Sequence, residues 1–238
     1  MDSPYKIEAQ KAVNSVDSFL RKTTENLGFI KNVVKDAVMS LTTGKGKEEA
    51  AGPLLNPPES TYNALRLARK LDEYQIRLAE DFPQSDYVAP EHPDYQSLCI
   101  KIAIIEGLIA GAPVDTHRLS REMNDKFKNN LNSDIFDEAC GIIENYAKEG
   151  GKGTNRPLPE MEKLEKICNR ILTLKNNIQL FIMNRTSSPF SRDYNREVQT
   201  LVQDFLNLKP SPNMLRVFLS KIQSINLNVH EVVAKMDW

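Results

Sequence analysis

The sequence predicts an all-α protein made of antiparallel helical bundles, with about eight helices and a long N-terminal helix that carries a heptad pattern. Apolar residues recur at alternating steps of three and four along most of the chain, which is the spacing of one helix face. No segment shows sustained period-two alternation bounded by hairpin turns, as strands would. The 13 prolines and 10 glycines fall largely between the periodic segments, where they separate one helix from the next.

The N-terminal helix is expected over residues 4–41, after an N-cap and first-turn pair at Ser3 and Pro4. Its apolar seam has a mean step of 3.5 residues, which is typical of helices that pack lengthwise against one another. Four seam residues are therefore candidates for contact with a partner helix, including a second copy of the chain in a homodimer. These four residues are Leu20, Leu27, Ile30 and Val34.

The stretch "TTGKGKEEAAGPLLNPP" interrupts the periodic pattern and predicts a linker over residues 42–56. It does not match a phosphate-binding loop, because Leu41 stands where the first glycine is needed and Gly46 follows Gly44-Lys45 in place of a hydroxyl residue. A second break, "GGKGTNRPLP", follows residue 149. We therefore expect a long amphipathic helix over 1–41, a linker over 42–56, a four-helix unit over 57–150, and a three-helix unit over 159–238 packed on the preceding one.

The four middle helices are predicted to begin and end at turn residues. They are expected at about 58–82, 94–111 and 116–131, and from 133 to about 149. Asp115 or Thr116 can cap the third, and Ser133 or Asp134 can cap the fourth. The prolines of "DFPQSDYVAPEHPDY" make the connection over 83–93 non-helical. Beyond the second break, Ser188-Pro189 and Ser211-Pro212 open the last two of three further helices.

The passage "CIKIAIIEGLIAGAPVDTH", residues 99–117, is the most apolar part of the chain. It is too short for a membrane span, and Lys101 and Glu106 interrupt it. We interpret it as the central buried helix of the middle unit. On a helical wheel, Glu106 falls on an apolar face, which makes it a candidate buried functional carboxylate. Either an arginine or lysine of a neighbouring helix pairs with it, or it serves a function in a pocket.

Two polar clusters flank this helix, "EHPDY" before it and "DTH" after it. A continuous helix over 94–111 would hold the clusters about 25 Å apart, so they cannot share one site. His92 and Asp94 therefore stand alone as a candidate loop site. The sequence contains no G-x-S-x-G, no H-E-x-x-H and no G-x-G-x-x-G, so we assign no catalytic residue, no metal and no cofactor.

Composition narrows the classes of partner. Net charge is −1, from 31 basic and 32 acidic residues, which argues against nucleic-acid binding. Cys99, Cys140 and Cys168 lie in apolar stretches and are odd in number, which predicts free thiols in a reducing, cytoplasmic compartment. The start "MDSPYKIEAQ" lacks the apolar region of a secretory signal peptide.

The second helix carries a candidate basic face. Its cations are either a solvated helix face or a patch for anionic lipid headgroups or an acidic partner. The stretch "RLARKLDEYQIR" also contains acids, which favours the first interpretation. The basic residues are Arg66, Arg69, Lys70 and Arg77.

Two Lys- and Asn-rich helical segments, "KFKNNLNSDIFDEACGIIENYAKEGG" and "RILTLKNNIQLFIMNRTSS", resemble those of helical effector proteins injected by intracellular bacteria such as Legionella. The resemblance is one of composition and implies action in a host cytosol. The acidic C-terminal cluster of many such effectors is missing, since the tail "VHEVVAKMDW" has only Glu231 and Asp237. No functional residues carry over from this resemblance.

These observations favour a non-enzymatic helical module that binds or scaffolds other proteins, because the helices and their seams are the strongest pattern in the chain. The alternative is a helical module that contacts a membrane surface or anionic lipid. A third hypothesis is an all-α enzyme with a site near residues 83–93.

Overall fold

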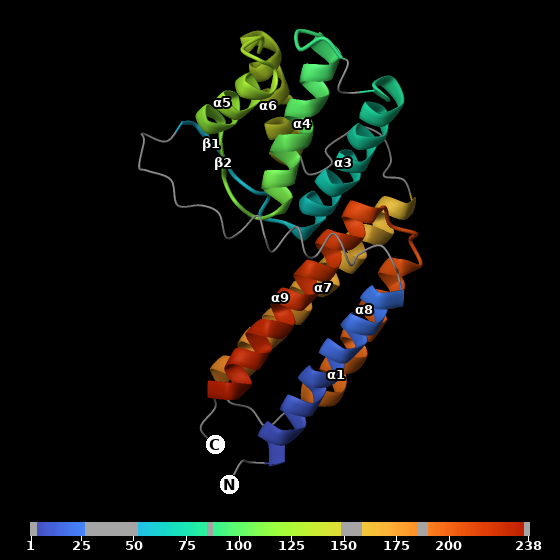
Figure 1. Cartoon of the computed structure of the whole chain (residues 1–238). Helices are drawn as coiled ribbons and strands as arrows, with labels where there is room; N and C mark the ends of the chain where they lie inside the picture. The colour runs from blue at the N-terminus through green and yellow to red at the C-terminus, as the bar shows by residue number, and fades with distance from the viewer. Residues whose placement is uncertain (1–3, 27–51, 85–87, 149–158, 185–189, 236–238) are drawn as a thin grey trace. The chain divides into compact units, whose positions relative to one another are not determined.

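The structure, a computed structural model, is all-α, as the sequence predicts (Figure 1). Its described residues form eight helices and one small two-stranded sheet, and they fall into two compact units. The middle unit comprises β1, α3, α4, β2, α5, α6 and the start of α9 up to Val217. The terminal unit comprises α1, α7, α8 and the rest of α9. The described residues are 4–26, 52–84, 88–148, 159–184 and 190–235.

The terminal unit is a bundle in which α1 packs along α8, and α8 packs along α7. The predicted seam of the N-terminal helix enters this core, since Val13, Val16 and Leu20 are buried. Phe205 and Phe218 stack with their ring centroids 3.9 Å apart. The predicted extension of the first helix over 27–41 lies outside the described residues. The helices are α1 (Pro4–Asn26), α7 (Pro159–Asn184), α8 (Phe190–Leu206) and α9 (Pro212–Lys235).

A polar network crosses the core of the terminal unit. Asn226 is fully buried, and its carbonyl oxygen accepts a hydrogen bond of 2.7 Å from the Tyr194 hydroxyl. Its amide donates to the Asp17 carboxylate and to the Val13 carbonyl oxygen. His230 Nε2 lies 2.7 Å from Asp17, and because a carboxylate only accepts, His230 donates this bond. The network therefore fixes α1, α8 and α9 in one register.

Burial, reinforced by the negative charge of Asp17, raises the pKa of the Tyr194 phenol well above its ordinary value. The hydroxyl therefore stays protonated and remains available as a donor to Asn226. A buried amide oxygen that lost this donor would keep its desolvation penalty without compensation.

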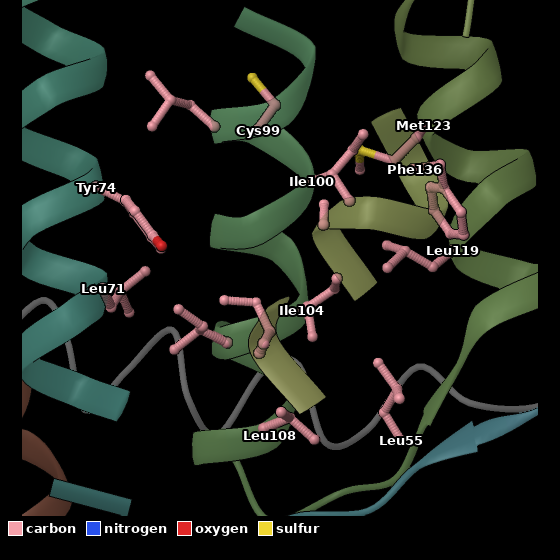
Figure 2. Close-up of a cluster of buried hydrophobic side chains, with 14 of the residues drawn as sticks. Leu55, Leu71, Tyr74, Cys99, Ile100, Ile104, Leu108, Leu119, Met123 and Phe136 are labelled. Carbon is pink, nitrogen blue, oxygen red and sulfur yellow. The ribbon is translucent and has the colours of Figure 1, made fainter. Parts of the chain in front are cut away.

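The middle unit is built around α4, which packs against both α3 and α6. Figure 2 shows Ile100, Ile104 and Leu108 of α4 between side chains of α3 and side chains contributed by α5 and α6. The inward faces of these neighbours supply Leu71 and Phe136, among others. The helices are α3 (Thr61–Asp81), α4 (Pro93–Ile109), α5 (Thr116–Lys126) and α6 (Ser133–Lys148).

A two-residue ladder, which the sequence did not predict, joins β1 (Leu54–Leu55) to β2 (Val114–Asp115) in antiparallel register. It is too short to produce a period-two pattern. The Thr116 amide and hydroxyl both donate to the Pro53 carbonyl oxygen, at 3.1 and 3.0 Å. Gly107 makes room beside β2, since a Cβ there would lie 2.6 Å from Val114 Cγ2. The segment before α3 is thereby fastened to the start of α5.

One predicted helix cap is confirmed and one is corrected. Asp115 caps α5, and its carboxylate accepts hydrogen bonds from the amides of His117 and Arg118. Neither Ser133 nor Asp134 caps α6. The side chain of Asn132 does so, accepting from the Asp134 amide at 2.9 Å. Asn132 and Ser133 are both favoured at such positions, so sequence alone places this boundary only to within a residue.

We expect Tyr194→Phe to destabilise the terminal unit by about 1–3 kcal/mol, because it leaves the buried Asn226 oxygen without its donor. Hydrogen exchange of α8 and α9 amides measures this locally, which matters because two units can unfold separately. In an Asn226→Ala background the same change should have little effect. Equal losses in both backgrounds would show that the hydrogen bond is not the cause.

Candidate functional site

Glu106 is exposed, so the expectation of a buried carboxylate is wrong. Its Oε1 atom lies 3.4 Å from the donor Gln75 Nε2 on α3. The helical wheel gave the wrong result because α4 is apolar on nearly all its sides. A wheel identifies the buried side of a helix by contrast with a polar side, and α4 has no distinct polar side. Whether Glu106 has a function stays a prediction, but burial no longer supports one.

His92 and Asp94 lie at the start of α4, where His92 is the N-cap residue and Asp94 is exposed. The His92 ring packs edge-on against Phe82, with centroids 5.0 Å apart. Its Nδ1 atom is buried and has no hydrogen-bond partner among the described residues. Since α4 is continuous over Pro93–Ile109, this cluster and the one at Asp115 and His117 lie at opposite ends of one helix, as predicted.

Gln96, which sequence reasoning missed, organises the same end of α4. It is fully buried and donates to the carbonyl oxygens of Pro90 and Asn130, at 2.7 and 2.6 Å. Its own oxygen accepts from the Asn132 amide at 3.0 Å. These bonds fasten the loop before α4 to the loop before α6. The side chain of Gln96 thus stabilises the fold.

Acidic and aromatic side chains lie among the cations of the predicted basic face on α3. Lys70 Nζ lies 2.6 Å from Glu73, to which Arg69 is also close, at 3.8 Å. Arg77 pairs with Asp81 at 3.7 Å. The Arg66 guanidinium stands 4.5 Å from the centroid of the Tyr146 ring. The four cations are brought onto one helix as expected, but neighbouring groups neutralise or stack against them.

Of the predicted partner-helix seam, Leu20 is buried inside the terminal unit. Leu27, Ile30 and Val34 lie outside the described residues. The described part of the seam is therefore used for packing within the chain.

A groove with a volume of about 650 Å³ lies between α5 and α6 in the middle unit. Its floor is apolar and includes Leu55, Leu131 and Phe136. Pro53 and, from β1, Leu55 also line the groove. The walls are the facing stripes of the two helices. They comprise His117, Ser120, Arg121 and Asn124 on α5, and Ser133, Asp137, Cys140, Gly141 and Glu144 on α6.

The end of the groove is fixed by the cap of α5. The Gly52 amide donates to both oxygens of the Asp115 carboxylate at 3.3 Å. Hydrogen bonds from the amides of Arg118, Gly52 and His117 lower the pKa of Asp115, so the cap stays ionised. Gly52 also lies against the His117 ring, since a Cβ there would come within 2.5 Å of its Cγ. The segment at Gly52 and Pro53 is thus held against the first turn of α5.

Charged side chains lie on both walls of the groove. The lining residues include Arg121 on α5, and Asp137 and Glu144 on α6. Glu144 pairs with the exposed Lys148 at 2.5 Å. Burial, aided by the charges of Asp137 and Glu144, raises the pKa of the Cys140 thiol to about 11. At neutral pH this thiol is protonated and is a poor nucleophile.

Gly141 is the unusual residue of the groove. It lies in the interior of α6, where glycine is about 1 kcal/mol less favourable than alanine. Among the described residues, a Cβ placed there would meet nothing within 4 Å. Packing between these residues therefore does not require glycine at this position, whereas it does at Gly107. What the glycine provides is a stretch of helix backbone that is open to close approach from the groove.

Other site types find no support in the described part of the chain. It contains no group of three or more His, Cys, Asp or Glu side chains placed to hold a metal ion. None of its helices is both long enough and apolar enough to cross a membrane. The chain matches no protein-family model, no curated protein and no solved structure.

Sequence reasoning missed the groove because residues 53–55 and 116–144 come together only in the folded chain. One local signal was present. In "IFDEACGIIENY" a glycine interrupts a strongly periodic helix, with no turn residue beside it and no break in the apolar spacing. Such a glycine indicates close packing or a functional contact.

We predict opposite effects for alanine at the two helix glycines. Gly141→Ala should stabilise α6 by about 0.5–1 kcal/mol, because the added methyl group meets open space. Gly107→Ala should destabilise the middle unit by about 1–3 kcal/mol, because the methyl group meets Val114. Hydrogen exchange of α4 and α6 amides measures both effects. Val114→Ala should restore stability to Gly107→Ala, and a lack of rescue would contradict the steric explanation.

The Cys140 thiol should react with iodoacetamide slowly at pH 8, with a rate that rises until about pH 11. Relative to a thiol of ordinary pKa, its thiolate fraction at pH 8 is about 100-fold smaller. Peptide mapping after timed alkylation gives the rate for this cysteine alone. Asp137→Asn combined with Glu144→Gln should lower the pKa and speed the reaction, because negative charges disfavour the thiolate. A rate that levels off below pH 9 would contradict this.

Proposed function

We propose that this protein is a non-enzymatic helical module that binds a protein partner, and that the α5–α6 groove receives a helix of that partner. The observation that carries the proposal is Gly141, a helix-interior glycine that lines the groove and has open space where its side chain would stand. Glycine there weakens α6, and packing among the described residues does not require it. Close approach of an outside backbone is a requirement that glycine alone meets.

The shape of the groove favours a helical occupant. On α6 the lining residues run from Ser133 to Glu144, a distance of about 16 Å, or three helical turns. An apolar floor between two polar helical walls suits the apolar stripe of an amphipathic helix. The stripe would rest on Leu55 and Phe136, both already buried at the floor.

The chemistry of the groove supports binding in preference to catalysis. Its thiol, Cys140, has a raised pKa, which is the opposite of what a cysteine nucleophile needs. The other candidate location is the loop before α4. There the Gln96 side chain makes structural hydrogen bonds, and the His92 ring packs against Phe82. An enzyme with a site near residues 83–93 is therefore the weaker proposal.

The alternative proposal, a module for a membrane surface or anionic lipid, rests on the basic face of α3. The face carries Glu73 and Asp81 among its cations, so much of its positive charge is balanced within the helix. Solvent screens what remains. The groove therefore supports a protein partner better than the basic face supports a lipid.

Two further proposals complete this function. The resemblance to bacterial effectors suggests action in a host cytosol, and the three free cysteines fit a reducing compartment. A homodimer through the N-terminal helix rests on the spacing of Leu27, Ile30 and Val34 alone, because Leu20 is buried within its own unit.

A selection of displayed helical peptides against the intact protein tests the docking site. We expect Gly141→Leu to weaken binding of the selected peptides at least tenfold, because the leucine side chain would occupy the groove. Asn145→Leu is the matched control, since it places the same side chain on an exposed position of α6 outside the groove, and binding should stay within twofold. Binders insensitive to Gly141→Leu, or a selection that returns none, would count against the proposal.

A further inference from the structure

We propose that Lys101, on α4, is a site of covalent acylation, where the side-chain amine takes an acyl group from an activated ester or a thioester. The fold selects this lysine over Lys70, which stands against the same aromatic ring. The site goes beyond the proposed function, because Lys101 and the residues around it are not among those that line the α5–α6 groove.

Two lysine ammonium groups stand against the ring of Tyr74. This tyrosine is buried on α3, and its side chain reaches toward α4 (Figure 2). The Nζ atom of Lys70 lies 5.2 Å from the centroid of the ring, and the Nζ atom of Lys101 lies 5.8 Å from it. A ring attracts cations, but two cations that share one ring also repel each other. A carboxylate in contact with each ammonium group would offset this repulsion.

Only one of these two lysines has such a carboxylate. Lys70 donates a hydrogen bond of 2.6 Å to Glu73, one turn further along α3. Among the described residues, Lys101 forms no hydrogen bond or ion pair. Lys101 is also partly exposed, which leaves it open to a small acyl donor in solution. The cluster therefore contains two amines in similar positions, one paired and one unpaired.

Burial lowers the pKa of Lys101. Of the charges around it, Glu138 on α6 and Asp94 on α4 raise this pKa, whereas Arg77 and Lys70 on α3 lower it. The effect of burial prevails, so more of this amine is neutral at a given pH than in an ordinary lysine. Partial desolvation and a neighbouring cation are the two features that activate a lysine amine as a nucleophile.

The paired amine shows the opposite balance. Burial acts to lower the pKa of Lys70 as well, but the hydrogen bond and the charge of Glu73 outweigh it, and the pKa is raised. The ion pair thus keeps Lys70 protonated and unreactive. Because both amines stand against Tyr74, the difference between them comes from the ion pair and not from the ring.

Acyl transfer uses the neutral amine and yields an uncharged amide. The nitrogen lone pair attacks the carbonyl carbon of the donor, and a C–N bond forms while the C–O or C–S bond to the leaving group breaks. The proton that the nitrogen loses ends on the alcohol or thiol that leaves. At Lys101 the product removes a partly buried charge that has no carboxylate in contact. At Lys70 it would break the ion pair with Glu73.

Trace labelling of the intact protein with the acetyl ester of N-hydroxysuccinimide, followed by peptide mapping, compares the two amines directly. At pH 8 we expect Lys101 to be acetylated about fivefold faster than Lys70, or more, because more of it is neutral. The Lys101 rate should level off below pH 10.5, the ordinary value, and the Lys70 rate above it. The acetyl thioester of N-acetylcysteamine should give the same order. In concentrated urea the difference should disappear.

Charge variants should move the Lys101 rate in opposite directions. Glu138→Gln removes a negative charge that favours the ammonium form, so Lys101 should react faster. Lys70→Gln removes a positive charge that disfavours it, so Lys101 should react more slowly. Both rates are expressed relative to that of Lys163, an exposed lysine on α7 in the other unit, within the same sample.

Stability provides a readout that does not depend on reagent access. Lys101→Gln, which resembles the acetylated side chain, should slow hydrogen exchange of α4 amides at pH 7 by about twofold or more, because it removes an unpaired and partly buried charge. Lys101→Arg keeps the charge and should not slow it. Lys70→Gln should instead speed the exchange of α3 amides, because it removes the partner of Glu73.

Three results would overturn the proposal. The first is acetylation of Lys70 as fast as that of Lys101 at pH 8 in the folded protein. The second is a preference for Lys101 that persists in concentrated urea, since it would then come from the local sequence and not from the fold. The third is a Lys101 rate, relative to that of Lys163, that neither Glu138→Gln nor Lys70→Gln changes.

Discussion

The burial of α4 is the constraint on which the middle unit depends. Ile100, Ile104 and Ile105 have no exposed surface. Ile100 and Ile104 lie four residues apart on one face of the helix, and Ile105 points to another side. Each such side chain stabilises the fold by about 1.5–3 kcal/mol only if it is fully covered. One neighbour cannot cover a helix that is apolar nearly all round, so α3 and α6 pack on either side of it (Figure 2).

The groove follows from this arrangement. The buried positions of α6 are Phe136, Ala139, Ile143 and Ala147, which form the stripe turned toward the core. The positions between them, including Asp137, Gly141 and Glu144, are therefore turned away from α4. The short helix α5 packs into the core cluster through Leu119 and Met123, and the groove lies between α5 and this surface of α6. A free helix face with a glycine at its centre is thus a consequence of how α4 is covered.

What the sequence predicted well depends on local spacing. The all-α class, the burial of Val13 and Val16, and the Asp115 cap each follow from patterns within a few turns of chain. Glu106 was misjudged because a wheel needs a polar face to orient it, and α4 lacks one. Gln96 and the Tyr194–Asn226 bond could not be predicted, because each joins segments that lie 32 or more residues apart. The groove could not be predicted because it needs residues 53–55 to meet residues 116–144. Of these three features, only the groove has a local signal in the sequence, which is the glycine inside α6.

Two polar systems among the described residues differ in a way that bears on the proposed function. In the terminal unit, Asn226, Tyr194 and Asp17 satisfy one another inside a bundle, where an unpaired polar atom would be costly. Such a closed network stabilises one register and leaves no capacity for a ligand. In the groove, Asp137 and Glu144 stand at the surface, where water solvates them at little energetic cost. The proposed partner would therefore replace water around these two carboxylates without breaking the fold.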